Sequence, residues 1–103
     1  MTEEEKKLFE QAVEFFNKKD YDKSKSLYEE ILKINPKNSA IYGNLGVIFR
    51  IKGDVATAIK YYIEAIKLDP KNLPIYNNLA NAFKEIKNYK MALQVYADIL
   101  KIN

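Results

Sequence analysis

The chain has 103 residues, 48% of them hydrophobic, and its 17 basic and 14 acidic residues leave a net charge of +3. It contains no cysteine and no histidine, which rules out disulfides and thiol nucleophiles and removes the commonest general base and transition-metal ligand. The apolar runs fall short of the roughly 20 residues that cross a membrane, so no membrane partner is expected. Because histidine and cysteine are absent, no metal or other cofactor is expected either.

Six helices are predicted in chain order, near residues 5–18, 21–34, 39–52, 55–68, 73–86 and 89–102. Thr2 and Glu5 form a capping box before the first helix. Apolar residues recur within the segments at helical spacing, and Gly53-Asp54 is a helix stop followed by a capping side chain. Pro36 and Pro70 end the second and fourth helices, because a proline discourages helix in the residue before it.

The sequence repeats itself with a period of 34 residues. Lys33–Asn38 returns as Lys67–Asn72, and the residues around Pro36 match those around Pro70. A repeat of this length is one small supersecondary unit, which buries its apolar face only by stacking on copies of itself. The sequence therefore predicts an all-α solenoid of three helix-turn-helix units, with six antiparallel helices.

The recurring residues resemble the signature of the tetratricopeptide repeat family. The second repeat supplies Tyr42, Leu45, Gly46, Phe49, Ala58, Tyr62, Ala65 and Pro70. The third supplies Tyr76, Leu79, Ala80, Phe83, Ala92, Tyr96 and Ile99, and ends before its proline. The resemblance implies a right-handed superhelical solenoid in a single domain, 1–103, with repeats at 5–38, 39–72 and 73–103. The family usually adds a capping helix, and none is expected within this sequence.

The two ends of the predicted stack differ. In this family the first helix of each repeat packs on the preceding repeat, and the first repeat carries polar residues on that face, as an N-terminal end should: Lys7, Gln11, Glu14 and Lys18. The last helix keeps the apolar pattern of an internal helix at Val95, Tyr96, Ile99, Leu100 and Ile102. Bare apolar surface marks an interaction site or a truncation. These five residues are therefore the candidates for self-association, and a longer parent protein is the other interpretation.

A concave groove lined by the first helices is the site that the family resemblance implies. The candidate groove residues are Phe9, Val13, Asn44, Val47, Asn77, Asn78 and Asn81. Phe9 and Val13, together with Phe16, suggest an apolar pocket at one end, and the asparagines an amide-rich stretch at the other. The alternative is that Phe9 and Phe16 belong in part to the core of the first helix pair.

Asn44 and Asn78 occupy the same repeat position, similar to the asparagine ladder of repeats that recruit extended peptides to sugar-transferring enzymes. A primary amide both donates and accepts, so it can clamp a peptide backbone whatever its side chains. The alternative is that these amides bond to the adjoining helix. The carboxylate clamp of chaperone-binding relatives is not predicted, because only Asn44 matches among its five positions, occupied here by Phe9, Val13, Asn44, Pro74 and Asn78.

The predicted function is a non-catalytic protein-interaction module, an adaptor or scaffold that binds an extended protein or peptide segment in the groove. Two alternatives stay open: a segment that self-associates into a homo-oligomer through its last helix, and the substrate-recruiting part of a larger enzyme. No nucleic-acid partner is expected, because the lysines are spread along the chain among carboxylates and Arg50 is the only arginine. The start lacks the apolar stretch of a secretory signal, so a cytoplasmic location follows by default.

Overall fold

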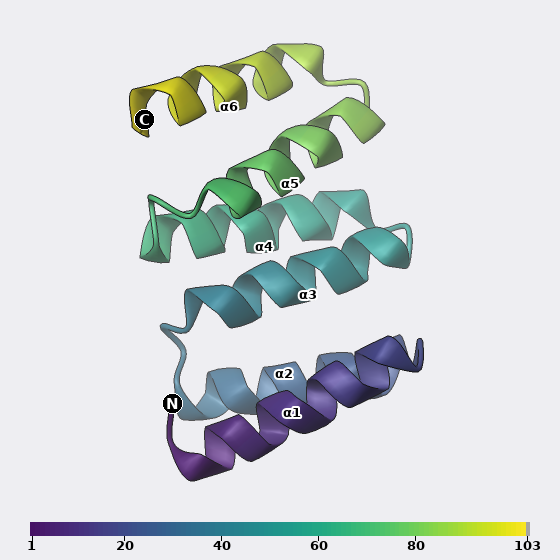
Figure 1. The fold of residues 1–103 in the computed structure, drawn as a ribbon. Coiled ribbons are helices and arrows are strands. Elements are labelled where there is room, and N and C mark those ends of the chain that lie inside the picture. The colour runs from purple at the N-terminus through teal and green to yellow at the C-terminus, as the bar shows by residue number, and fades with distance from the viewer. Residues whose placement is uncertain (103) are drawn as a thin grey trace.

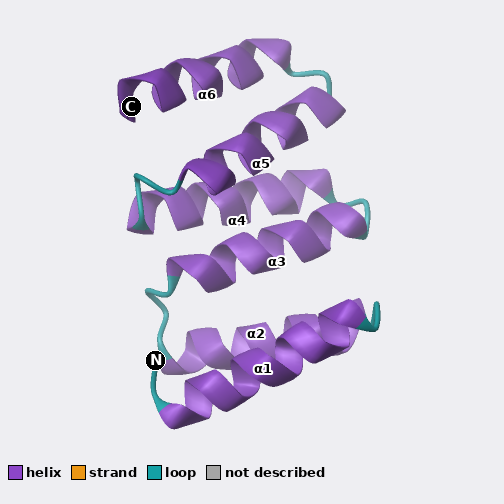
Figure 2. Ribbon diagram, in the orientation of Figure 1, coloured by secondary structure: helices purple, strands orange, loops and turns teal. Residues whose placement is uncertain are grey.

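The computed structural model describes residues 1–102, which form six α-helices with no strand among them. The helices are α1 (Glu3–Asn17), α2 (Tyr21–Ile34), α3 (Ser39–Ile51), α4 (Val55–Leu68), α5 (Leu73–Glu85) and α6 (Tyr89–Ile102). They stack in chain order from α1 to α6 (Figure 1), joined by short loops (Figure 2), and each packs mainly on its neighbours in the chain. The predicted all-α repeat solenoid is confirmed. Asn103, the last residue of the predicted third repeat, lies outside the described residues.

Local signals in the sequence set the helix ends. The Thr2 hydroxyl accepts a hydrogen bond from the Glu5 amide at 3.2 Å, as the first half of the predicted capping box requires. Asp54 caps α4 in the same way through the Thr57 amide. The first helix of each pair ends just before a residue with positive φ, at Lys19 (64°), Gly53 (90°) and Lys87 (63°), one repeat period apart.

Small residues bring the two helices of a pair close together. A Cβ added to Gly46 of α3 would lie 2.6 Å from the ring of Tyr62 on α4, and that ring is fully buried. Ala12 and Ala80 occupy the same repeat position and are also fully buried. Glycine or alanine at this position therefore makes room for the tyrosine of the second helix.

The buried core consists of two clusters that meet at α3. Ile41, Leu45 and Ile48 of α3 pack with residues of α1 and α2 in the first cluster. The second cluster lies among α4, α5 and α6, and α3 contributes its partly buried residues Tyr42, Val47 and Phe49. The third helix thus supplies side chains to both clusters and holds the first pair of helices against the rest.

The turns between helix pairs are held by a repeated hydrogen bond. The Tyr42 hydroxyl donates to the carbonyl of Pro36 at 2.9 Å, and the Tyr76 hydroxyl donates to the carbonyl of Pro70 at 2.8 Å. Each bond ties the first turn of α3 or α5 to the proline before it. The same bond at both turns gives the two successive helix pairs matching connections.

Candidate functional site

A cavity of about 240 Å³ opens where α1, α2 and α3 meet. Its lining consists of Phe9, Val13, Phe16, Tyr28, Asn44 and Val47. Four of the seven predicted groove residues therefore converge on one cavity, although they come from two helices that are far apart in the sequence. Five of the six lining side chains are aromatic or aliphatic, so the cavity suits an apolar group.

Tyr28 of α2 is the lining residue that sequence reasoning missed. It is only 3% exposed, and its ring meets Phe9 edge to face with centroids 6.0 Å apart. Tyr28 shares its repeat position with Tyr62, which is a recurring signature residue and is fully buried in the core. Tyr28 also lines the cavity, and the candidate groove residues did not include it because they were taken from the first helix of each pair only.

Asn44 lies beside the Tyr28 hydroxyl within this cavity. Burial raises the pKa of Tyr28, and hydrogen bonding with the Asn44 and Ser24 side chains acts in the opposite direction. The alternative interpretation of Asn44, that its amide bonds to the adjoining helix, would use this Tyr28 hydroxyl of α2. A primary amide has two donors and an acceptor, so one neighbour still leaves groups for a ligand.

The three asparagines of α5 lie apart from the cavity. Asn77 is exposed, whereas Asn78 and Asn81 are half-buried. An ion pair joins the C-terminal ends of α3 and α5, with Arg50 Nε donating to Glu85 Oε1 at 2.6 Å. That hydrogen bond raises the pKa of Arg50 further above its usual range. The candidate groove residues therefore fall into two separate groups, the apolar cavity and the asparagines of α5.

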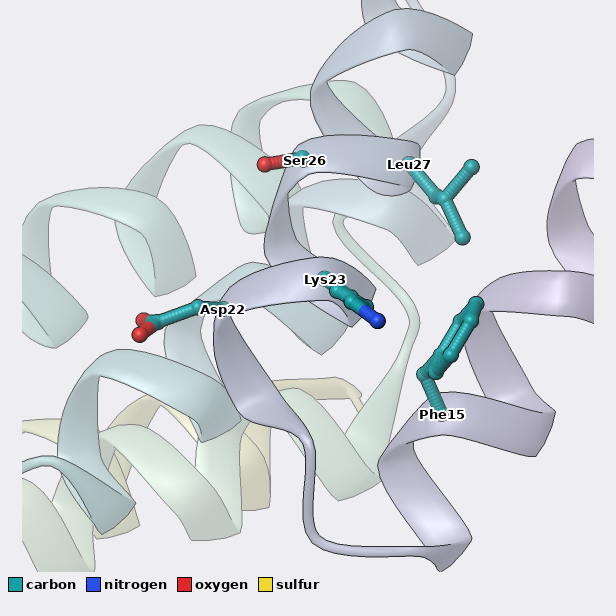
Figure 3. Close-up of a pocket in the computed structure, with 5 residues that line it drawn as sticks. All are labelled: Phe15, Asp22, Lys23, Ser26 and Leu27. Atoms are coloured by element: carbon teal, nitrogen blue, oxygen red, sulfur yellow. The ribbon is translucent and has the colours of Figure 1, made fainter.

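A second and shallower hollow of about 390 Å³ lies between α1 and α2, outside the predicted groove. It is lined by Phe15, Asp22, Lys23, Ser26 and Leu27, and Figure 3 shows the side chains of Lys23 and Leu27 on the side of α2 that faces Phe15. The Lys23 ammonium stands 5.2 Å from the centre of the Phe15 ring. In the second repeat Tyr61 replaces Leu27 and stacks on Phe49, with ring centroids 5.2 Å apart. The hollow therefore reflects a smaller side chain at the first repeat and does not indicate a ligand.

The candidate residues for self-association lie on two different faces of α6. Val95 is 4% exposed, and Ile99 and Ile102 pack against the core cluster, so these three are covered within the chain itself. They face α5 because they occupy the side of α6 that completes its own helix pair. Tyr96 and Leu100 are exposed, at 37% and 75%.

The fold and the repeated packing define the chain as a helical-repeat protein. Family models described as tetratricopeptide repeat match residues 8–38 and 73–103, and residues 27–60, while a model described as TPR repeat matches residues 47–87. The chain therefore belongs to the tetratricopeptide repeat family. A search of curated proteins found no match.

Solved structures of tetratricopeptide repeat domains share the fold. The TPR domain of Sgt2 from Aspergillus fumigatus is 26% identical with a TM-score of 0.88, over 98% of this chain and 67% of that one. The TPR2B domain of yeast Sti1 in a pHsp70 complex is 23% identical, with a TM-score of 0.89 over 95% and 78%. The first TPR of Spaghetti (RPAP3), bound to the HSP90 peptide SRMEEVD, is 17% identical, with a TM-score of 0.89 over 100% and 82%.

No helix within residues 1–102 has both the length and the apolar character needed to cross a membrane. Over the same range, no three or more Asp or Glu side chains gather as metal ligands would.

Proposed function

We propose that the chain is a non-catalytic interaction module that binds an extended peptide across α1, α3 and α5. The observation that carries the proposal is the apolar cavity, in which Phe9, Val13 and Val47 converge with an amide, Asn44, among them. A peptide that lies along the first helices would place one aliphatic or aromatic side chain in this cavity. The peptide-bound states of the Sti1 and Spaghetti domains support peptide binding as a use of this fold.

Peptide selection tests the proposal without a known partner. A random dodecapeptide library displayed on phage is selected on the immobilised chain, and enriched peptides are titrated by calorimetry. We expect them to share one aliphatic or aromatic residue and to bind with a dissociation constant of about 1 µM or weaker, near −8 kcal/mol. Val13→Asp should weaken binding at least about tenfold, because it buries an unpaired carboxylate beside the peptide side chain.

Gln11→Asp is the matched control, since it adds the same charge to the same helix at an exposed position outside the cavity. It should leave the affinity unchanged. Failure of any peptide to enrich, or equal binding to the Val13→Asp and Gln11→Asp variants, would contradict the proposal.

The amide ladder is a separate part of the proposal. If Asn44 and Asn78 clamp the peptide backbone, the double variant Asn44→Ala with Asn78→Ala should weaken a selected peptide by about 1–3 kcal/mol for each amide that is buried in the complex. Titration of one peptide against the single and double variants measures this loss. Unchanged affinity would show that the apolar cavity binds the peptide without the ladder.

Capture of an acidic carboxyl terminus is not expected. Phe9 and Val13 stand where the family's clamp has lysine and asparagine, and Pro74 and Asn78 stand where it has lysine and arginine. The free peptide SRMEEVD and its C-terminally amidated form should therefore bind equally weakly in a fluorescence titration. A clear preference for the free carboxylate would overturn this expectation.

The two alternative functions, substrate recruitment and self-association, use different parts of the molecule from each other. Recruitment of substrates to a larger enzyme would use the same groove and needs a catalytic part outside these residues. Self-association would use α6, which contributes nothing to the cavity lining. Peptide binding in the groove and self-association through α6 can therefore be separated by mutation.

A further inference from the structure

Four apolar residues form a continuous exposed row along α6. Tyr89, Leu93, Tyr96 and Leu100 are 58%, 69%, 37% and 75% exposed. They are spaced i, i+4, i+7 and i+11, which places them within an arc of about 60° around the helix axis. We call these four residues the α6 row. Only Tyr96 and Leu100 belong to the set expected from the sequence.

The same row is covered one repeat earlier. Its counterparts on α4 are Val55, Ile59, Tyr62 and Ile66, and Ile59 and Tyr62 are only 9% and 0% exposed. They belong to one core cluster with Ile75, Leu79 and Ala82 of α5. These α5 residues repeat the i, i+4, i+7 spacing, and α4 and α5 run antiparallel (Figure 1). The molecule itself therefore shows what covers such a row: an antiparallel helix with an apolar row of matching spacing.

We infer that a second copy of this chain covers the α6 row, with the two α6 helices antiparallel about a two-fold axis. The spacing of the row, 4, 3 and 4 residues, reads the same in both directions. Reversing one copy therefore aligns all four positions at once. Tyr89 of each copy faces Leu100 of its partner, and Leu93 faces Tyr96. Each layer pairs an aromatic ring with a leucine, and no position of the row is left without an apolar partner.

The opposite end of the molecule does not offer a competing surface on a second copy. On α1 the positions equivalent to the packing face of α5 carry Lys7, Gln11, Glu14 and Lys18, and all four are exposed. Placing these side chains on the α6 row would bury charges without partners. A second copy therefore meets the row tail to tail, which gives a closed, self-complementary pair. One helix from each copy makes a small interface, so the dimer is weak.

The charges that flank the row predict how salt affects the dimer. Lys90 and Lys101 are exposed and each follows a residue of the row. In an antiparallel pair about a two-fold axis, equivalent flanks lie on the same side, so Lys90 of one copy comes close to Lys101 of the other. Like charges repel and salt screens them, so the dimer strengthens as ionic strength rises.

Sedimentation of the whole chain tests the inference. The average mass should rise from 12.0 kDa toward twice that value between about 10 µM and 1 mM. Leu93→Glu should weaken the dimer at least tenfold. Met91→Glu, on the other side of the same helix and 39% exposed, should not change it. Lys90→Glu should tighten the dimer severalfold at low salt, a gain that misfolding does not produce. A chain that stays monomeric at 1 mM, or a dimer whose stability does not change with Leu93→Glu, overturns the inference.

Cross-linking tests the register, since the natural chain has no cysteine. A mixture of Tyr89→Cys and Leu100→Cys variants should form a mixed disulfide dimer under mild oxidation. Leu100→Cys alone should not, because its two copies lie about 16 Å apart along the axis in the antiparallel register. Efficient cross-linking of Leu100→Cys with itself would mean a parallel pair and would overturn the proposed arrangement.

Discussion

Replacement of Tyr62 by alanine is expected to destabilise the folded chain by about 3–5 kcal/mol, the usual cost of removing a large aromatic side chain from a core. The ring is fully buried, and it packs beside Gly46 of its own helix pair and in the cluster that includes Leu79 of the next. The free energy of unfolding of a native domain is usually only about 5–15 kcal/mol, so the variant should be close to unfolding at 25 °C.

Tyr96→Ala is the matched control, because Tyr96 has the same repeat position and is 37% exposed. Its cost should stay below about 2 kcal/mol, since much of its surface is already in water. Urea unfolding at low micromolar concentration, where association through α6 is absent, measures both variants. The larger loss at Tyr62 is expected because this ring also packs against the next repeat. Equal losses of unfolding free energy in the two variants would contradict this explanation.

The second large effect is expected at alkaline pH. Burial raises the pKa of Tyr28 and of Tyr62 above the ordinary value of 10.0. Above pH 10 the unfolded chain releases these two protons while the folded chain keeps them, so the unfolded state gains and stability falls as pH rises. Each tyrosine contributes up to about 1.4 kcal/mol per pH unit over this window, and neither contributes below pH 10.

The measurement is the urea midpoint between pH 8 and pH 11.5. We expect a flat profile up to about pH 10 and a steep fall above it. The Tyr28→Phe variant should show a shallower fall, because phenylalanine keeps the ring and has no proton to lose. A profile for that variant parallel to the natural one would mean that other groups cause the alkaline loss.

The sequence predicted the helices well because their ends depend on local chemistry. Proline, glycine and capping side chains act within a few residues, and the period of 34 repeats each signal. The predicted start of α3 at residue 39 agrees with the structure, and its predicted end at residue 52 differs by one residue. Stacking in chain order followed from the same repetition, since a helix pair has only its neighbours to pack on.

The sequence was less informative about faces and contacts between helices. The apolar pattern of α6 did not distinguish the exposed Leu93 from the buried Val95, because apolar residues lie on both sides of this helix. The ion pair between Arg50 and Glu85 joins residues 35 positions apart on helices that are not consecutive. Its formation depends on how α3 and α5 are placed, and no local pattern reports that.

The position of α3 in both core clusters has a consequence for how the molecule opens. Loss of α1 and α2 would expose one side of α3, and loss of α5 and α6 would leave that helix packed on the remaining neighbours. Neither end needs the other to open, so partial unfolding can start at both ends. Amide protons in the middle of α3 can exchange with solvent only after both openings. The slowest hydrogen exchange therefore belongs to the centre of the chain, and protection declines toward each terminus.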